Sequence, residues 1–383
     1  MRKDRQVAAI ERLLAVAARG APEAELVESS LEVERYTSAS QLEAEQRVLF
    51  RQLPLAVGRE SDLPEPGSFF THDAAGVPLL LTRDGAGVVH AMLNVCRHRG
   101  TRLVTGEQGS AKAFVCRYHA WTYDLGGKLG HVPLASCFPS LANERAESGL
   151  VELPCESRHG FLWVVPTPGA ELDMARWLGD FDDDLASFGL EEHVVFRRRT
   201  VTRAANWKLV MDAFLEGYHV KSLHQRTLSR FFAEDVVVDT SGSHVRSVGA
   251  RKNLAELAEA PREQWDVRTC TTVFFTLFPN SILVFHPETV SHIALFPRGL
   301  GEVTFVHTML APRQPATDEH RAALDKTWEL IDGSVFSQED LSIAESIQSV
   351  LGAGAQRTFR LGALEYPIRF FHDAIDRAIA ART

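Results

Sequence analysis

The chain has few cysteines, no long apolar run and no basic cluster, and each shortage excludes a class of protein. Five cysteines in 383 residues are too few for the disulfide framework of a small secreted domain, and an odd number leaves at least one unpaired. No run reaches the roughly 18 uncharged apolar residues of a membrane-spanning helix, so we expect no membrane partner. The net charge of −9 and the lack of a basic run argue against nucleic-acid binding. A reducing, cytoplasmic location is therefore expected.

The length and texture of the chain predict two domains and an N-terminal helical segment. Residues 1–46 interleave Glu and Leu, and we expect their helices to pack on the second domain. Residues 47–165 carry Pro and Gly between short apolar runs, which predicts a β-rich domain. Residues 166–383 mix strands and helices, with β-branched and aromatic runs over 273–306 that predict consecutive antiparallel strands. The predicted fold class is α+β.

Two short clips, each with one Cys and one His, lie in the β-rich part. Cys96 and His98 form the first clip, and Cys116 and His119 form the second after seventeen intervening residues. Two cysteines and two histidines can hold a Rieske [2Fe–2S] centre or a structural zinc ion. Zinc modules usually pair Cys with Cys and His with His along the chain, so the mixed clips favour the cluster.

A second constellation begins with His219 and His224, on a stretch predicted to be helical from Asn206 onward. Residues five apart on an ideal helix lie about 140° apart around its axis. If the two histidines share a metal, the helix must therefore loosen or end between Val220 and Leu223. The alternative is one core histidine and one surface histidine without a common task.

A carboxylate further along the chain favours a shared metal over two unrelated histidines. The segment from Phe336 to Ile347 is predicted to open a helix whose apolar face includes Asp340. A carboxylate directed into a core is costly unless it is paired or binds a metal. Alternatively, Ser337 to Asp340 could be a capping-box variant. Together with His219 and His224, Asp340 suggests the facial triad of non-haem Fe(II) oxygenases.

These segments resemble the α (terminal oxygenase) subunit of the Rieske non-haem iron ring-hydroxylating oxygenase family. The resemblance is carried by four stretches in the expected order, Asn94–Gly100, Cys116–Trp121, Asn206–His224 and Glu339–Asp340. It implies a Rieske [2Fe–2S] domain at 47–165 and a helix-grip (START/Bet v 1-like) catalytic domain with an antiparallel sheet at 166–383.

The resemblance also implies the ligand sets. The cluster would be held by Cys96, His98, Cys116 and His119, and the catalytic mononuclear Fe(II) by His219, His224 and Asp340. Ala120 stands where the family often carries Gly, which we do not expect to affect ligation. Ala213 stands where some members carry Asn, which bears on a side-chain amide contact near the iron and not on the ligands.

Glu216 is the residue to which the resemblance assigns electron transfer. The family has an acid there that hydrogen-bonds a cluster histidine of the neighbouring subunit and links it to an iron ligand. This implies a path from His119 through Glu216 to His219 across an interface of a cyclic homotrimer, with or without a β subunit. The alternative is a solvated Glu, three residues before His219 on one helix face.

The implied function is that of an oxidoreductase that incorporates O2, in aromatic compound catabolism. Electrons would come from NAD(P)H through a separate reductase, with or without a ferredoxin, because the chain has no dinucleotide or flavin fingerprint. We expect the Phe-rich strands of residues 273–306 to line the pocket, which suits a small aromatic substrate for hydroxylation.

Three alternatives stay open. Aromatic walls also bind quaternary ammonium groups, so mono-oxygenation with N- or O-demethylation of a methylated amine or ether of the carnitine or betaine kind fits equally. The chain could also be a Rieske electron-transfer and ligand-binding protein without a catalytic iron, or a zinc-stabilised ligand-binding protein.

Overall fold

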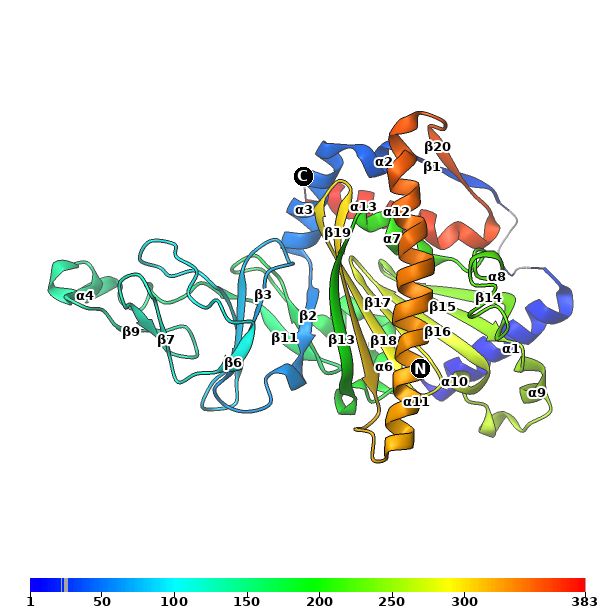
Figure 1. Ribbon diagram of the computed structural model, residues 1–383, viewed down its shortest axis with the longest axis horizontal. Coiled ribbons are helices and arrows are strands. Elements are labelled where there is room, and N and C mark those ends of the chain that lie inside the picture. Colours follow the sequence, from blue (N-terminus) through cyan, green and yellow to red (C-terminus); the bar gives the residue numbers. More distant parts are fainter. Residues whose placement is uncertain (22, 24–26, 383) are drawn as a thin grey trace. The chain divides into compact units, whose positions relative to one another are not determined.

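The computed structural model describes residues 1–21, 23 and 27–382 (Figure 1). The helical segment predicted over residues 1–46 also covers residues 22 and 24–26, which lie outside the described residues. Two compact units make up the chain: Gln46–Met174, and Met1–Glu45 together with Ala175–Thr383. Both contain antiparallel sheets and helices, which confirms the predicted α+β class. In the part of the chain that is described, no helix is both long enough and apolar enough to cross a membrane.

The unit Gln46–Met174 contains three small antiparallel sheets. Their strand orders are β10-β5-β4-β3-β6, β11-β12-β2 and β7-β8-β9. A glycine with positive φ shapes each of two tight turns, Gly87 (86°) between β4 and β5 and Gly127 (83°) between β8 and β9. The strands are β2 (Leu55–Arg59), β3 (Ser68–His72), β4 (Leu79–Arg83), β5 (Val89–Leu93), β6 (Gln108–Ser110), β7 (Phe114–Val115), β8 (Thr122–Tyr123), β9 (Leu129–His131), β10 (Glu152–Leu153), β11 (Cys155–Arg158) and β12 (Phe161–Val164), with a short helix α4 (Leu141–Glu144).

The other unit is built on a seven-stranded antiparallel sheet with the order β13-β19-β18-β17-β16-β15-β14. The runs predicted between residues 273 and 306 are four consecutive, neighbouring strands, which confirms that prediction. β14 and β15 were not predicted from the sequence. The strands are β13 (Val194–Arg203), β14 (Phe232–Ser241), β15 (His244–Arg251), β16 (Thr271–Leu277), β17 (Ser281–Phe285), β18 (Val290–Gly299) and β19 (Glu302–Ala311).

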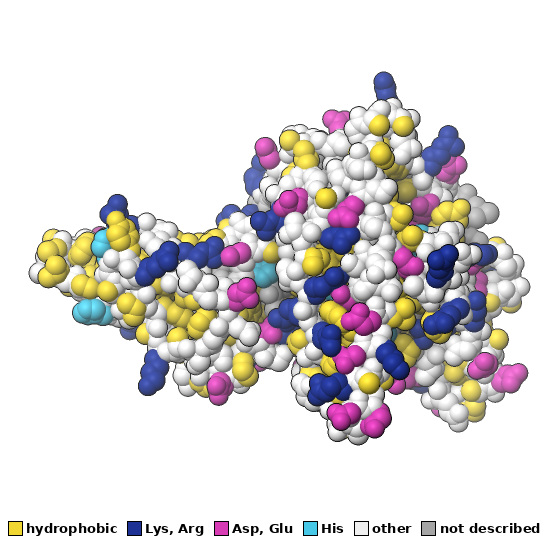
Figure 2. Space-filling model, viewed as in Figure 1, with side chains coloured by type: hydrophobic (Ala, Val, Ile, Leu, Met, Phe, Trp, Pro, Cys, Tyr) yellow, Lys and Arg dark blue, Asp and Glu magenta, His cyan; other side chains and the backbone are white. Residues whose placement is uncertain are grey.

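A long helical rod crosses this sheet and is drawn in orange in Figure 1. It runs through α11 (Asp318–Trp328), a π-helical segment η5 (Glu329–Asp340) and α12 (Leu341–Val350). Leu324 and Trp328 of α11 pack against Met309 of β19. Figure 2 shows basic and acidic side chains intermixed over α11, as expected for the solvated face of an amphipathic helix.

N-terminal helices pack on the same unit. In α1 (Lys3–Arg19) the buried side chains recur at helical spacing, so α1 is an amphipathic helix. At the end of this segment, Glu45 of α3 (Ala39–Gln52) accepts hydrogen bonds from Trp207 Nε1 (2.9 Å) and Lys208 Nζ (2.5 Å) of α7 (Trp207–Leu215). Both members of the Lys208–Glu45 ion pair are buried, so this contact fixes the start of α7 against the N-terminal helices.

Candidate metal centres

The segment that carries the two histidines is broken into two helices. α7 ends at Leu215, Glu216 is extended (φ −137°, ψ 161°), and α8 (Val220–Leu223) is a single turn. The carboxylate of Glu216 accepts hydrogen bonds from the backbone N–H groups of Tyr218 and His219, so it stabilises the start of α8. The predicted single helix from Asn206 to His224 is therefore wrong. The interruption predicted between Val220 and Leu223 lies instead between Leu215 and Val220, because residues Val220–Leu223 form α8, which ends next to the non-helical His224.

Asp340 lies in the middle of the long rod and does not open a helix. The rod is already helical from Asp318, so the capping-box interpretation of Ser337–Asp340 is wrong. The side chain of Asp340 is 6% exposed, as its predicted place on the apolar face requires. It sits where the π-helical segment passes into α12, and π-helical turns are frequent at functional sites.

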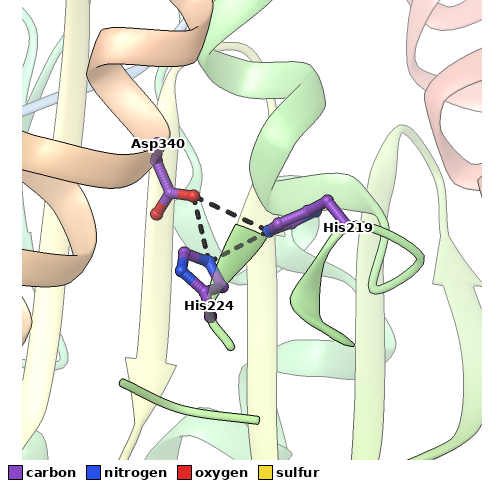
Figure 3. A group of neighbouring side chains, drawn as sticks. All are labelled: His219, His224 and Asp340. Atoms are coloured by element: carbon purple, nitrogen blue, oxygen red, sulfur yellow. Dashed lines mark hydrogen bonds and ion pairs between the residues drawn. The ribbon is translucent and has the colours of Figure 1, made fainter. Parts of the chain in front are cut away.

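These three side chains converge on one point (Figure 3). His219 Nε2 and His224 Nε2 are 3.2 Å apart, and Asp340 Oδ1 lies 3.1 Å from His224 Nε2 and 3.6 Å from His219 Nε2. Three cis ligands at about 2.1 Å from one ion would stand about 3 Å apart. His219 and His224 flank the single-turn helix α8 as its N-cap and C-cap residues, and their side chains meet from its two ends.

The outer nitrogens of both imidazoles are held by carboxylates. His219 Nδ1 is 2.5 Å from Glu216 Oε1, and His224 Nδ1 is 2.7 Å from Glu339 Oε2. A proton on each Nδ1 leaves an unshared electron pair on each Nε2, directed toward the other and toward Asp340. Three electron-rich atoms at this distance need a cation or a proton between them. The residues present therefore fit a divalent metal.

The pKa of His224 reflects the two carboxylates beside it. Burial disfavours charge on His224, but the hydrogen bonds and charges of Asp340 and then Glu339 outweigh burial and raise its pKa. Asp340 Oδ1 is buried and accepts no well-formed hydrogen bond. A bound metal would take the place of the proton on His224.

Glu339 and Thr227 also belong to the site, although no role was predicted for either from the sequence. Thr227 Oγ1 donates to Glu339 Oε2 at 2.7 Å, which orients that carboxylate toward His224. Such outer partners fix the ring orientation of metal-bound histidines. The position of Glu339 directly before Asp340 was the signal that could have identified it.

A cavity of about 460 Å³ opens onto the triad, and His219, His224 and Asp340 are among its lining residues. The prediction that the Phe-rich strands of residues 273–306 line it is wrong for most of their phenylalanines: of that run only Phe274 does so, while Phe275 and Phe285 pack in the core. Successive strand residues face opposite sides of a sheet, so half of the run points away. The other aromatic lining residues are Phe214, Phe231, Phe232, Phe336 and Tyr366.

In the unit Gln46–Met174, the two clips fold into matching loops. Each loop closes with a hydrogen bond from the fifth residue back to its cysteine, Gly100 N to Cys96 O (3.0 Å) and Ala120 N to Cys116 O (2.8 Å). The cysteine N–H groups bond onward to Thr101 O and Trp121 O, each at 2.8 Å. Two equivalent loops present one thiol and one imidazole each.

The histidines of the two loops meet edge to face, with ring centroids 4.6 Å apart. The Nδ1 atoms of His98 and His119 are both buried, and neither has a hydrogen-bond partner. Buried polar atoms are otherwise paired, so two adjacent orphan nitrogens fit a missing ligand that they would bind. Both cysteines are buried in the core of this unit. The four residues therefore fit a [2Fe–2S] cluster with one Cys and one His per loop.

Aromatic groups surround the four side chains. Trp121 stacks on His98 at 4.8 Å, and the Tyr123 hydroxyl lies 3.3 Å from Cys96 Sγ and accepts from Arg97 N. Burial, then the charges of His119 and Arg99, lower the pKa of His98, which keeps its imidazole neutral for ligation. Hydrogen bonds to the sulfurs tune the potential of such clusters.

Hydrophobic side chains gather on the surface of this unit around β7, β9 and α4 (Figure 2). Val115, Tyr118 and Leu134 are 57%, 54% and 78% exposed. The Tyr118 ring stacks on His119 with ring centroids 3.7 Å apart, and the Tyr118 hydroxyl accepts a hydrogen bond from Arg99. Exposed apolar groups of this kind mark interaction surfaces.

Two protein-family profiles match the chain. The profile of the Rieske [2Fe–2S] domain matches residues 54–143, and that of the ring hydroxylating alpha subunit (catalytic domain) matches residues 190–381.

Curated relatives include oxygenase subunits. The chain is 31% identical over 210 residues to the glycine betaine monooxygenase oxygenase subunit of Pseudomonas aeruginosa, covering 54% of this chain and 48% of that protein. It is 25% identical over 363 residues to the carnitine monooxygenase oxygenase subunit of Escherichia coli, covering 89% and 91%. The aligned chain thus spans about half the length of the betaine monooxygenase relatives that it matches.

Solved structures share the fold. The naphthalene 1,2-dioxygenase of a Rhodococcus species bound to indole superposes with a TM-score of 0.77 at 19% identity, covering 98% of each chain. A quaternary ammonium Rieske monooxygenase with L-carnitine superposes with a TM-score of 0.78 at 22% identity, covering 92% of this chain and 95% of that one.

Proposed function

The chain belongs to the ring-hydroxylating oxygenase alpha-subunit family, and from this we propose that it is the terminal oxygenase component of a multicomponent Rieske non-haem iron oxygenase. Its reaction would incorporate O2 into a small substrate, with electrons from a NAD(P)H-dependent reductase, with or without a ferredoxin. Cys96, His98, Cys116 and His119 would hold the [2Fe–2S] cluster in a domain at residues 47–165. The domain at residues 166–383 would hold the mononuclear iron.

One observation carries the proposal for the catalytic iron. His219 Nε2, His224 Nε2 and Asp340 Oδ1 converge within 3.6 Å, and the outer nitrogens of both imidazoles are held by carboxylates. Three ligands from one side leave positions open toward the 460 Å³ cavity. When bound, the iron would supply the activation of dioxygen, while the chain positions the ligands, orients the substrate and excludes water.

The cavity supports hydroxylation of a small aromatic substrate as the main proposal, because six aromatic side chains from several elements line it. N- or O-demethylation of a methylated amine or ether is the second candidate. The relatives named for betaine and carnitine favour this candidate, and aromatic faces bind quaternary ammonium groups. A relative named for anthranilate dioxygenation favours the first.

Electron delivery would cross between subunits of a homotrimer, with or without a β subunit. Glu216 is bonded to His219 within the chain, and its side chain is 11% exposed. Tyr118 is exposed and stacks on His119, so the surface next to the cluster of one subunit would lie against Glu216 and His219 of the neighbouring subunit. A cytoplasmic location stays a prediction from the sequence.

Iron counting and product analysis test this proposal together. We expect about three irons per chain, two in the cluster and one at the triad, and Asp340→Asn should lose about one of them. With a surrogate reductase and isotope-labelled dioxygen, a panel of aromatic acids and methylated amines should yield labelled products. About two irons per chain would support an electron-transfer protein, and a colourless, zinc-loaded chain would exclude the oxygenase.

Glu216→Gln isolates the proposed electron bridge. The amide keeps the size of the side chain but removes its charge, so we expect both metals to stay bound and product formation to fall below detection. Glu365→Gln is the matched control, because Glu365 lies close enough to Glu216 and His219 to interact with their charges, but in the described part of the chain its carboxylate bonds to the backbone of Gly362 and to neither of them. Unchanged turnover in Glu216→Gln would remove this residue from the path.

A further inference from the structure

A positively charged side chain lines the cavity on the sheet side. Arg251 ends β15, and Ser247, Gly249 and Arg251 alternate along that strand as lining residues. Side chains two residues apart on a strand share a face, so the Arg251 side chain is on the cavity face of the sheet. Gly249 contributes no side chain between the other two, which leaves space in front of the guanidinium.

Arg251 lacks a counter-ion. Its buried Nε has no hydrogen-bond partner, and none of the carboxylates in the described part of the chain forms an ion pair with it. The guanidinium instead lies over the rings of Phe232 (5.5 Å) and Phe231 (6.0 Å). Burial lowers the pKa of Arg251, which reflects the cost of this unpaired charge.

Among the described residues that line the cavity, no acidic side chain is free to neutralise Arg251. The acidic side chains that line the cavity already have partners: Glu23 with Arg12, Glu216 with His219, Glu234 with Lys221 and Asp340 with His224. Cys270 lies close enough to interact electrostatically with Arg251, but burial raises the pKa of its thiol to about 11, so the thiol stays neutral. The uncompensated charge of the cavity is therefore positive.

We propose that Arg251 determines substrate specificity by binding the carboxylate of an anionic substrate, an inference that rests on the proposed function. A guanidinium presents paired donors that match a carboxylate, and apolar walls strengthen such a bond. The substrate class is a small monocarboxylate whose apolar or methylated body extends along the aromatic walls toward the triad. Aromatic acids and trimethylammonium acids share this chemistry.

Binding to the iron-loaded wild-type chain tests the proposal without turnover. Anaerobic calorimetry compares benzoate with benzamide, and trimethylglycine with choline. In at least one pair we expect the acid to bind about tenfold or more tightly than its partner without a carboxylate. Equal affinities within both pairs would overturn the proposal, whatever any variant does.

Variants test whether Arg251 causes the tighter binding of the acid. Arg251→Met keeps the length of the side chain, and we expect it to weaken binding of the preferred acid about 10- to 100-fold and to bring the affinity ratio of the pair close to one. Arg251→Lys should restore part of the ratio, since it keeps the charge without the fork. Arg230→Met is the matched control, because Arg230 also lies over Phe231 (4.6 Å) but is exposed and does not line the cavity. A ratio that survives in Arg251→Met would overturn the proposal.

Turnover with a surrogate reductase separates this inference from the proposed function. An acid preference that depends on Arg251, without any oxygenated product, would leave the inference standing and overturn the oxygenase proposal. Oxygenated products from uncharged substrates alone would overturn the inference and leave the oxygenase proposal standing.

Discussion

Ala120 occupies in the second loop the place that Gly100 occupies in the first, and both backbones are left-handed, with φ of 56° and 74°. A Cβ atom in this region costs about 1 kcal/mol. Ala120→Gly should therefore raise the free energy of unfolding of this unit by about 1 kcal/mol, without changing the ligands. Urea unfolding followed by cluster absorbance measures the change.

Ala113→Gly is the control for this prediction. Ala113 is exposed in the same unit and is not among the described non-glycine residues with positive φ. Glycine there adds only freedom to the unfolded chain, so stability should fall slightly. If both variants lower the midpoint, the Ala120 backbone is not strained in solution.

His244 is a buried residue whose protonation should change the free energy of unfolding as the pH falls. Its Nε2 donates to Trp177 O (2.8 Å) and its Nδ1 accepts from Phe278 N (2.9 Å), so the ring is held neutral. Burial lowers its pKa from 6.5 to about 4. As the pH falls from 6.5 to 4, the unfolded chain takes up a proton that the folded chain does not, and up to about 3 kcal/mol of stability is lost.

The measurement is chemical unfolding from pH 7 to pH 4 for the wild type and His244→Gln. The variant should be less stable at pH 7 and should show a shallower loss toward acid. His131→Gln, at an exposed position, should keep the wild-type slope. Parallel curves for the wild type and His244→Gln would contradict a neutral, buried His244.

At the scale of elements, the residues of the two candidate sites could be predicted, whereas the path of the chain that brings them together could not. Residue type and spacing indicated both candidate ligand sets, but the 140° conflict between His219 and His224 placed the interruption of the helix after Val220, whereas it lies before His219. The break at Glu216 depends on hydrogen bonds from Tyr218 and His219 that no periodicity encodes. Likewise, a π-helical segment inside a rod has the same local sequence pattern as an ordinary helix.

Strands that contain charged residues were harder to predict from the sequence. β14 contains Glu234, Asp235 and Asp239, and its alternation is interrupted by a register shift between Phe232 and Val236. The runs of phenylalanine correctly predicted the strands, but most of these side chains do not line the cavity. The side of the sheet to which each ring points is set by register and not by composition.

Two elements meet at Glu339, where η5 supports a histidine that follows α8. Glu339→Gln should weaken iron binding at the triad about 10- to 100-fold, because an amide holds the His224 ring and its tautomer less firmly than a carboxylate. Competition with a chelator, scored by iron retained per chain, measures the loss. Gln338→Ala, one residue earlier and exposed, should retain iron like the wild type. Equal retention by Glu339→Gln would show that Glu339 does not support the ligand.

At the scale of the whole molecule, the candidate cluster ligands and the candidate iron ligands lie in different compact units of one chain. If electrons cross between subunits as proposed, a chain with only one working site can cooperate with a chain that has only the other. Cys116→Ser should lose the cluster and keep the triad, while Asp340→Ala should do the reverse. Each variant alone should be inactive.

Mixed trimers of these two variants test the direction of transfer. In a cyclic trimer assembled at random from equal amounts, about a quarter of the interfaces join an intact cluster to an intact triad on the next subunit. Co-expression should therefore restore about a quarter of wild-type product formation, whereas transfer within one chain would restore none. Mixing the two variants after assembly, without subunit exchange, is the control and should stay inactive. Activity of the co-expressed sample no higher than that control would refute transfer between subunits, because no chain in it carries both sites.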